Sequence, residues 1–199
     1  MPDTSRIRIQ QVETLSADWG LLKKTTFDYL RRDGSWQRQT RETYDRGNGA
    51  TILLYDRERR TVLLIRQFRL PTLGNGLDDG LLVETPAGLL DAAAPEARIK
   101  AEVEEETGYR LDNVQHLFDA FMSPGSVTEL LHFFAGEYRA DQRIADGGGL
   151  HEEGEDIELL ELPFDEALAM ARDGRLLDGK TIMLLQYAAL KLRPHLAVS

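Results

Sequence analysis

The chain has 199 residues, a formal net charge of −10 and no cysteine. The acidic balance argues against nonspecific binding to nucleic acids or anionic membranes, which requires clustered Lys and Arg. The lack of cysteine excludes disulfides, thiolate metal ligands and a thiol nucleophile. No stretch approaches the roughly 18 apolar residues that span a bilayer. Residues 1–6 also lack the apolar run of a signal peptide, so we expect a cytoplasmic protein.

The first 45 residues are typical of β-structure. Ile7, Ile9 and Val12 are spaced for an extended segment. Residues 22–29 and 36–44 flank Asp33-Gly34, a strong hairpin signal. A hairpin of this kind is marginal alone, so its partner surface is expected on the rest of the chain or on a second subunit.

The rest of the chain predicts strands around one internal helix, followed by two closing helices. Continuous apolar runs in the first two strands of this part predict burial on both of their faces. Glycine-rich segments at 71–80 and 146–154 predict loops, and the second is expected to be flexible and acidic. The expected strands are 50–55, 61–68, 81–84, 114–121, 130–138 and 157–162, and the expected helices are 95–107, 163–172 and 179–192, with Pro163 in the first turn of its helix.

Three glutamates on the internal helix are the strongest candidates for chemistry. Glu102 and Glu106 are one helical turn apart, and Glu105 lies on nearly the same face. Like charges at this spacing repel by about 0.3 kcal/mol per pair. Mg²⁺ prefers such oxygen ligands and bridges carboxylates to substrate phosphates. The alternative interpretation is a solvated acidic face.

The segment from Gly88 to Tyr109 resembles the box of the Nudix hydrolases, Gly-x5-Glu-x7-Arg-Glu-U-x-Glu-Glu-x-Gly-U, where U is bulky and apolar. The residues that match it in order are Gly88, Glu102, Val103, Glu105, Glu106, Gly108 and Tyr109. The segment is one residue shorter than the pattern and lacks its first glutamate. Ala101 replaces the arginine that braces the carboxylates. Arg98 and Lys100 are candidate substitutes for it, although neither occupies the matching helical position.

The resemblance extends over nearly the whole chain and is greatest to the Nudix branch that hydrolyses GDP-mannose, which shares the shortened box. Its signatures match residues 40–50, 64–69, 122–125, 132–134 and 178–181. The resemblance implies an α/β fold, a Nudix α/β/α sandwich around a mixed sheet. An N-terminal β-hairpin appendage would occupy residues 1–46, and the Nudix hydrolase domain would occupy residues 47–199.

The resemblance also implies a site for Mg²⁺, with Mn²⁺ as a substitute. The implied metal ligands are the carbonyl of Ala87 and the carboxylates of Glu102, Glu106 and Glu155. The implied catalytic residues are Glu105, Glu153 and Glu155, with Glu153 as the candidate base and His151 as a loop residue.

Substrate contacts are implied in both parts of the chain. Arg41 and Glu42 would bind the nucleotide, across the interface of a homodimer that exchanges its N-terminal β elements. Arg69 and Lys180 would meet the phosphates, as a bidentate donor and a point charge.

Two further substrate contacts are weighed against structural roles. Trp19 stands where an aromatic residue stacks on the base, or it packs within the hairpin. Glu129 contacts the substrate or is a charge at the start of a strand.

The expected activity is Mg²⁺-dependent hydrolysis of a nucleoside diphosphate sugar, from GDP-mannose to GMP and mannose 1-phosphate. The first alternative is an ADP-ribose pyrophosphatase that gives AMP and ribose 5-phosphate. The second is a catalytically weak Nudix-fold binding protein, motivated by Ala101 and the absent first glutamate.

Overall fold

The computed structural model describes residues 6–192 apart from the side chain of Glu153. Two compact units make up this part of the chain. The N-terminal unit contains residues up to 48 together with 121–130, and the larger unit contains 49–120 and the residues from 131 onward. None of the helices in the described range is long and apolar enough to cross a membrane.

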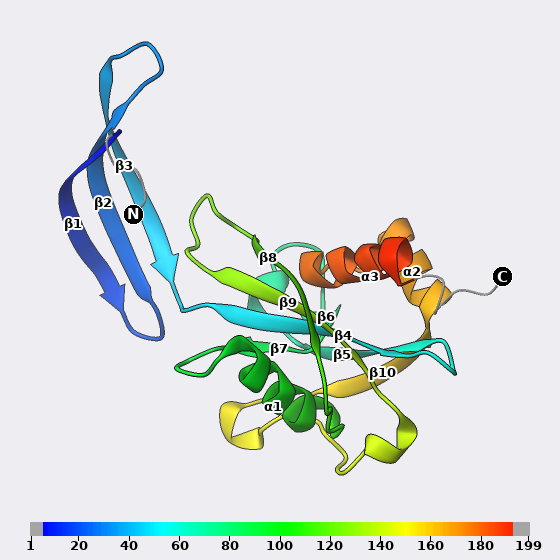
Figure 1. Ribbon diagram of the computed structural model, residues 1–199. Coiled ribbons are helices and arrows are strands. Elements are labelled where there is room, and N and C mark those ends of the chain that lie inside the picture. Colours follow the sequence, from blue (N-terminus) through cyan, green and yellow to red (C-terminus); the bar gives the residue numbers. More distant parts are fainter. Residues whose placement is uncertain (1–5, 193–199) are drawn as a thin grey trace. The chain divides into compact units, whose positions relative to one another are not determined.

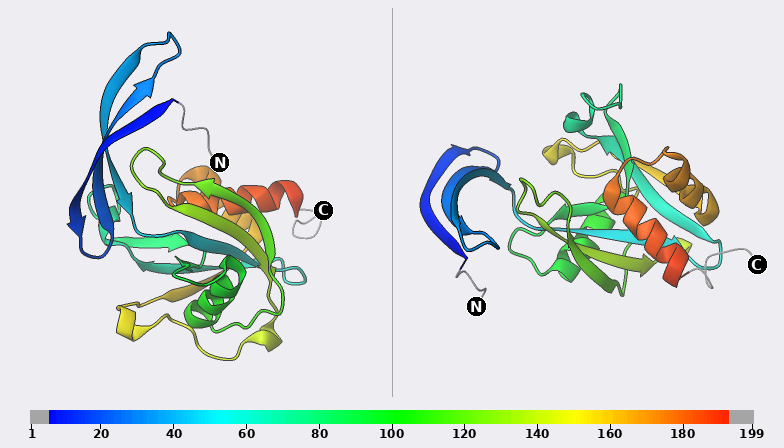
Figure 2. Two further views of the ribbon diagram at one scale, coloured as in Figure 1. Left: turned by 60° about the vertical axis from the view of Figure 1, so that its left-hand side comes forward. Right: turned by 90° about the horizontal axis from the view of Figure 1, so that it is seen from above.

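The N-terminal unit is a curved antiparallel sheet of three strands, drawn from blue to cyan in Figure 1 and seen from two further directions in Figure 2. Its central strand β2 pairs with both neighbours over almost its full length. The strands are β1 (Ile7–Ala17), β2 (Leu21–Leu30) and β3 (Trp36–Asp45). The hairpin predicted from the sequence is therefore confirmed, with β1 as its additional partner.

The turn between β2 and β3 forms at Asp33-Gly34, as the sequence predicted. Gly34 has a φ of +83°, a conformation that glycine adopts without steric cost. The Asp33 carboxylate accepts hydrogen bonds from the backbone N–H of Ser35 at 2.9 Å and from its hydroxyl at 2.6 Å. Local side-chain chemistry thus closes the hairpin.

The segment 121–130 belongs to the N-terminal unit, which the sequence did not predict. The N–H of Tyr44 donates to the carbonyl of Ser126 at 2.7 Å, and the N–H of Thr128 donates to the carbonyl of Tyr44 at 3.0 Å. Backbone pairing at the end of β3 therefore holds this segment. The predicted boundary at residues 46 and 47 falls in the connection between β3 and the next strand.

The larger unit is built on a seven-stranded mixed sheet with the order β10-β5-β4-β9-β8; β6 pairs with β5 and β7 pairs with β4. Only the β4–β9 pair is parallel among the pairs with an assigned register. The strands are β4 (Gly49–Asp56), β5 (Thr61–Phe68), β6 (Leu81–Glu84), β7 (Ala87–Leu89), β8 (Gln115–Phe121), β9 (Leu130–Glu137) and β10 (Glu158–Pro163). Nearly every residue of β4 is buried, as its continuous apolar run predicted.

Helices cover both faces of this sheet (Figure 1). On one face, Ile99 and Val103 of α1 pack with Ile52, Leu54 and Phe134 of the sheet. The helices are α1 (Pro95–Thr107), α2 (Phe164–Asp173) and α3 (Gly179–Lys191), and the short 3-10 helices are η1 (Leu70–Thr72), η2 (Ala140–Gln142) and η3 (His151–Glu153). The expected α/β sandwich is confirmed.

The opposite face carries α3. Phe133 stacks on Phe118 with ring centroids 4.6 Å apart, and Phe118 lies 5.7 Å from the ring of Tyr187 in α3. Successive residues of β9 therefore serve different layers, because side chains alternate across a strand.

Element boundaries differ little from the expectations. The prediction that Pro163 occupies the first turn of α2 is wrong by one residue. Its ψ of 136° is extended, so Pro163 ends β10 and the helix begins at Phe164. The three-residue strand β7 was also missed, because Ala87-Gly88-Leu89 is too short to show an alternating pattern.

Candidate active site

Helix α1 carries the two most deeply buried acidic side chains of the predicted site. Glu102 is 5% exposed and Glu106 is 1% exposed, whereas the side chain of Glu105 is 29% exposed. Pro95 opens the helix and Gly108, with a φ of +74°, ends it. The helical turn therefore places Glu102 and Glu106 on one inward ridge, and the alternative of a solvated acidic face is wrong.

Gly88 in β7 makes room for the first carboxylate of this ridge. A Cβ at position 88 would lie 1.5 Å from Oε1 of Glu102, so a larger residue would displace the carboxylate. Ala87, whose carbonyl is the predicted fourth ligand, precedes it in the same strand. Glycine is thus required at position 88 because the strand and the Glu102 side chain approach each other closely.

The buried carboxylates lack enough positive charge around them. Burial, reinforced by the charges of Glu105 and Glu155, raises the pKa of Glu102 to about 7 despite the neighbouring Arg98. Burial and the charges of Glu102, Glu84 and Glu155 raise the pKa of Glu106 well above its usual value. Among the described residues, no group donates a hydrogen bond to the buried Oε2 of Glu106. Such an unsatisfied carboxylate oxygen fits a hard divalent cation.

Arg98, one of the two candidate substitutes for the missing box arginine, braces the ridge. Its Nη2 lies 2.5 Å from Oε1 of Glu102, and its Nη1 lies 3.7 Å from Oε2 of Glu105. Its Nε also donates to the carbonyl of Leu89 at 3.1 Å. Arg98 reaches Glu102 because residues i and i+4 are neighbours on a helix. Lys100 instead pairs with Glu96 at 2.8 Å and does not reach the ridge.

A second buried carboxylate, Glu84 at the end of β6, holds both predicted phosphate-binding cations. Nε of Arg69 donates to Oε1 of Glu84 at 2.7 Å, and Lys180 donates to Oε2. Burial alone would raise the pKa of Glu84, but Lys180 and Arg69 lower it below its usual value. Lys180 also lies 3.1 Å from Asp178. In the structure, Arg69 and Lys180 therefore both pair with the carboxylate of Glu84.

The start of α3 places Lys180 beside Glu84. The Asp178 carboxylate caps the helix by accepting from the N–H of Thr181 at 3.0 Å. The hydroxyl of Thr181 in turn accepts from the N–H of Thr85 at 2.7 Å. Sequence analysis missed Glu84 as a member of this cluster. A carboxylate at the end of the apolar run Leu81–Val83 was the available signal.

The acidic loop is anchored to the C-terminal end of α1. The N–H of Gly148 donates to the carbonyl of Glu106 at 2.9 Å, and that of Gly149 donates to the carbonyl of Glu105 at 3.1 Å. A Cβ at Gly147 would lie 2.5 Å from the Thr107 carbonyl carbon. Gly147 thus permits a close backbone approach to α1. The expected mobility of the loop stays a prediction.

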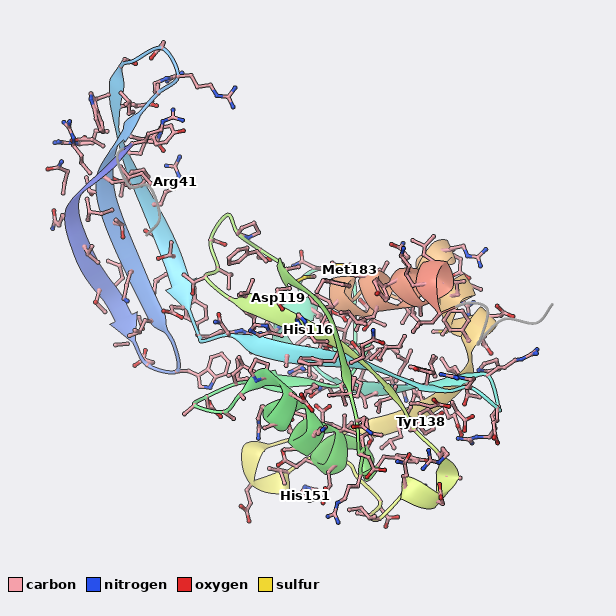
Figure 3. All side chains as sticks on the ribbon, in the orientation of Figure 1. Arg41, His116, Asp119, Tyr138, His151 and Met183 are labelled. Carbon is pink, nitrogen blue, oxygen red and sulfur yellow. The ribbon has the colours of Figure 1, made fainter. Side chains whose placement is uncertain are left out.

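Glu155 follows this anchored segment and lies near the ridge. Its charge contributes to the raised pKa of both Glu102 and Glu106. Its Oε2 accepts from the N–H of Leu150 at 2.9 Å, which fixes the side chain. His151, labelled in Figure 3, is exposed in η3. The side chain of Glu153, the candidate base, lies outside the described residues.

Comparisons with known proteins agree with this geometry. A family model described as the NUDIX domain matches residues 45–184, and one described as the GDP-mannose pyrophosphatase NudK N-terminal domain matches residues 6–44. The chain belongs to the Nudix family. The ridge of α1 and Gly88 lie within the segment matched by the NUDIX model, and Nudix hydrolases generally use a divalent metal ion.

Curated relatives cover almost the whole of this Nudix protein. A GDP-mannose pyrophosphatase from Yersinia enterocolitica is 59% identical over 184 residues, which cover 92% of this chain and 95% of the relative. Another from Yersinia pestis (strain Pestoides F) is 58% identical over 184 residues, with 92% of each chain covered. One from Pectobacterium atrosepticum is 57% identical over 188 residues, covering 94% and 96%.

The remaining predicted substrate contacts lie in the N-terminal unit. Trp19 is 71% exposed, so the alternative that it packs within the hairpin is wrong for the single chain. Arg41, labelled in Figure 3, is exposed on β3 and donates to the side chain of Gln39 at 3.0 Å. Glu42 beside it is also exposed. These three roles stay predictions.

Glu129 has a partner within the N-terminal unit. One of its carboxylate oxygens lies 2.7 Å from Nη2 of Arg46, and its side chain is 11% exposed. The pair joins the end of β3 to the segment 121–130. A structural role for Glu129 is thereby established, and its predicted substrate contact stays a prediction.

Proposed function

We propose that this protein hydrolyses the pyrophosphate bond of GDP-mannose, giving GMP and mannose 1-phosphate, and that it uses Mg²⁺. The substrate assignment is supported by the GDP-mannose pyrophosphatases that match more than nine-tenths of the chain. The metal assignment is supported by the acidic ridge, whose oxygen-only ligands suit Mg²⁺ and also Mn²⁺.

The single observation that carries the proposal is the buried, unpartnered Oε2 of Glu106. A cation there would be held by Glu102, Glu106 and Glu155, together with the Ala87 carbonyl. When bound, a divalent cation neutralises charge on the phosphates and makes an attacking water more acidic. The protein's own part is to hold the ligands in register, which Arg98 does by contacting Glu102 and Glu105.

Glu105, Glu153 and Glu155 are the proposed catalytic carboxylates. Glu105 is the most accessible ridge residue and would take a proton from a water that approaches the phosphorus. Glu155 is fixed by the Leu150 N–H and would serve as a ligand or share this task. Glu153 is the candidate base in the same loop.

Arg69 is the better placed of the two proposed phosphate-binding cations. Its side chain is 40% exposed, so its free N–H groups reach solvent while Nε holds Glu84. Lys180 is 13% exposed and shared between Glu84 and Asp178. A phosphate contact by Lys180 therefore requires it to give up one carboxylate partner.

We further propose a homodimer that exchanges N-terminal β elements and places Trp19, Arg41 and Glu42 on the nucleotide. Support comes from the apolar side chains that the N-terminal sheet leaves exposed, namely Ile7 at 42%, Ile9 at 59% and Val12 at 55%. Light scattering after gel filtration should give twice the mass of one chain, and a monomer at assay concentration contradicts the dimer. We place the enzyme in the cytoplasm.

A substrate panel tests the assignment. GDP-mannose, other sugar nucleotides and ADP-ribose are incubated with and without Mg²⁺, and release of nucleoside monophosphate is measured. The proposal predicts Mg²⁺-dependent GMP release, with GDP-mannose turned over most efficiently. Preferred turnover of ADP-ribose would instead assign the alternative pyrophosphatase activity. Ligand-induced thermal stabilisation without turnover of any substrate would identify a binding protein.

A further inference from the structure

Two histidines and an aspartate from neighbouring strands form a cluster that the hydrolytic site does not use. Nε2 of His116 and Nδ1 of His132 each lie 2.7 Å from Oδ1 of Asp119. The three potential ligand atoms all lie within 4.8 Å of one another. Figure 3 labels His116 and Asp119, which lie close together on β8. The cluster shares no residue with the glutamate ridge of α1.

Packing against the sheet holds the two rings. The ring of His116 makes an edge contact with Phe134, with centroids 5.3 Å apart. The side chain of His132 is 18% exposed, and its ring centroid lies 6.3 Å from that of His116. Both histidines come from strands, so their positions are more fixed than those of loop residues.

The carboxylate between the rings is ready to act as a ligand. The hydrogen bond from His116 lowers the pKa of Asp119 against the opposing effect of burial, and the hydrogen bond from His132 lowers it further. Side-chain exposures of 50% for His116 and 39% for Asp119 leave an entry path for an ion.

We propose that His116, Asp119 and His132 form a second metal site, which binds a transition-metal ion such as Zn²⁺. Imidazole nitrogens favour Zn²⁺ and related ions, whereas the oxygen ligands of the ridge favour Mg²⁺. Zinc–ligand bonds of about 2.1 Å separate tetrahedral ligand atoms by about 3.4 Å, so an ion requires each of the two His–Asp pairs to open by less than about 1 Å. Three protein ligands leave a fourth position for water or another small ligand.

Calorimetry on the metal-stripped full-length protein tests this site. Zn²⁺ is titrated in the presence of excess Mg²⁺, which occupies the ridge. The wild type should bind one Zn²⁺ that His116→Asn and His132→Asn each weaken by about tenfold or more, because loss of a ligand should cost at least as much as loss of an outer-shell partner. Mg²⁺-dependent hydrolysis should be unchanged in both variants, which also shows that they fold.

Two matched variants locate the effect. His151→Asn removes an exposed histidine outside the cluster and should leave the Zn²⁺ isotherm unchanged. Glu106→Gln alters the ridge and should also leave it unchanged. The proposal is overturned if the wild type binds no Zn²⁺ under these conditions, or if it binds Zn²⁺ with the same affinity as both cluster variants.

Discussion

Glu106 and Glu84 are two glutamates of the same unit, and each is 1% exposed. Glu84 is enclosed by Arg69 and Lys180, which lower its pKa against the effect of burial. Glu106 is buried among other carboxylates, and both the burial and their charges raise its pKa well above its usual value. Burial therefore does not distinguish the ion-paired carboxylate from the proposed metal ligand. The two differ in the positive charge around them, and its shortage at Glu106 supports the proposed cation site.

The largest expected effect comes from Glu106→Gln. Mg²⁺-dependent GMP release from GDP-mannose should fall by roughly 10²–10³-fold or more, comparable with the loss of an electrostatic catalytic group. The stability of the metal-free protein should change by less than about 1 kcal/mol, because an amide resembles the protonated carboxyl that the raised pKa favours. Steady-state kinetics and urea unfolding measure the two quantities. Activity within twofold of the wild type would contradict the assignment of Glu106.

Glu84→Gln, in contrast to Glu106→Gln, should lower the stability of the protein. The substitution leaves Lys180 and Arg69 facing a neutral group in a largely buried place. The free energy of unfolding should fall by about 2 kcal/mol, less than the 3–5 kcal/mol typical of fully buried pairs because Arg69 is partly exposed. Urea unfolding in parallel with Glu106→Gln provides the comparison. Equal stability of the two variants would show that the two carboxylates do not differ as described.

The sequence located the ridge but not the groups that hold it. The spacing of Glu102, Glu105 and Glu106 predicted one helical face, because helical periodicity is a local property. The contact of Arg98 with Glu102 has the same local origin, because residues i and i+4 are neighbours on a helix. Lys180 meets Glu84 from 96 positions away along the chain. Only the docking of α3 on Thr85 brings these residues together, and no local pattern encodes that.

For the fold as well, the sequence predicted local elements but not contacts between distant segments. Long elements with a clear hydrophobic pattern, such as α1 and β5, have the bounds expected from the sequence. The pairing of residues 121–130 with Tyr44 depends on backbone hydrogen bonds, which any sequence can make. Side-chain patterns therefore gave no sign that this segment joins the N-terminal unit.

Arg98→Ala should have a smaller effect than Glu106→Gln, because Arg98 positions ligands without being one. We expect about 10-fold to 100-fold weaker Mg²⁺ activation, as is typical of outer-shell partners of metal ligands. The Mg²⁺ concentration for half-maximal activity measures this. Lys100→Ala removes a neighbouring cation that pairs with Glu96, and it should leave Mg²⁺ activation unchanged. Equal effects of the two substitutions would remove the positioning role from Arg98.

The last expected effect is the pH dependence of stability in the metal-free protein. The folded-state pKa of Glu102 is about 7, above the ordinary value of 4.5, so the folded state retains a proton that the unfolded state releases. The stabilising contribution of this group is therefore present below about pH 4.5 and is lost as the pH rises towards about 7. Saturating Mg²⁺ should reverse the trend, because it binds the deprotonated form. Thermal unfolding of the wild type and Glu102→Gln across this range isolates the contribution, which should disappear in the variant.

Direct measurement of cation binding at the ridge is the sharpest test of the account. Mn²⁺ is titrated into metal-free protein without substrate, and free Mn²⁺ is followed by electron paramagnetic resonance. Both samples carry His116→Asn, so that any binding at the histidine cluster is weakened equally and a difference between them reports on the ridge. The account predicts that the protein with Glu106 sequesters Mn²⁺ and that the added Glu106→Gln substitution abolishes this binding. Equal sequestration by both proteins would contradict it.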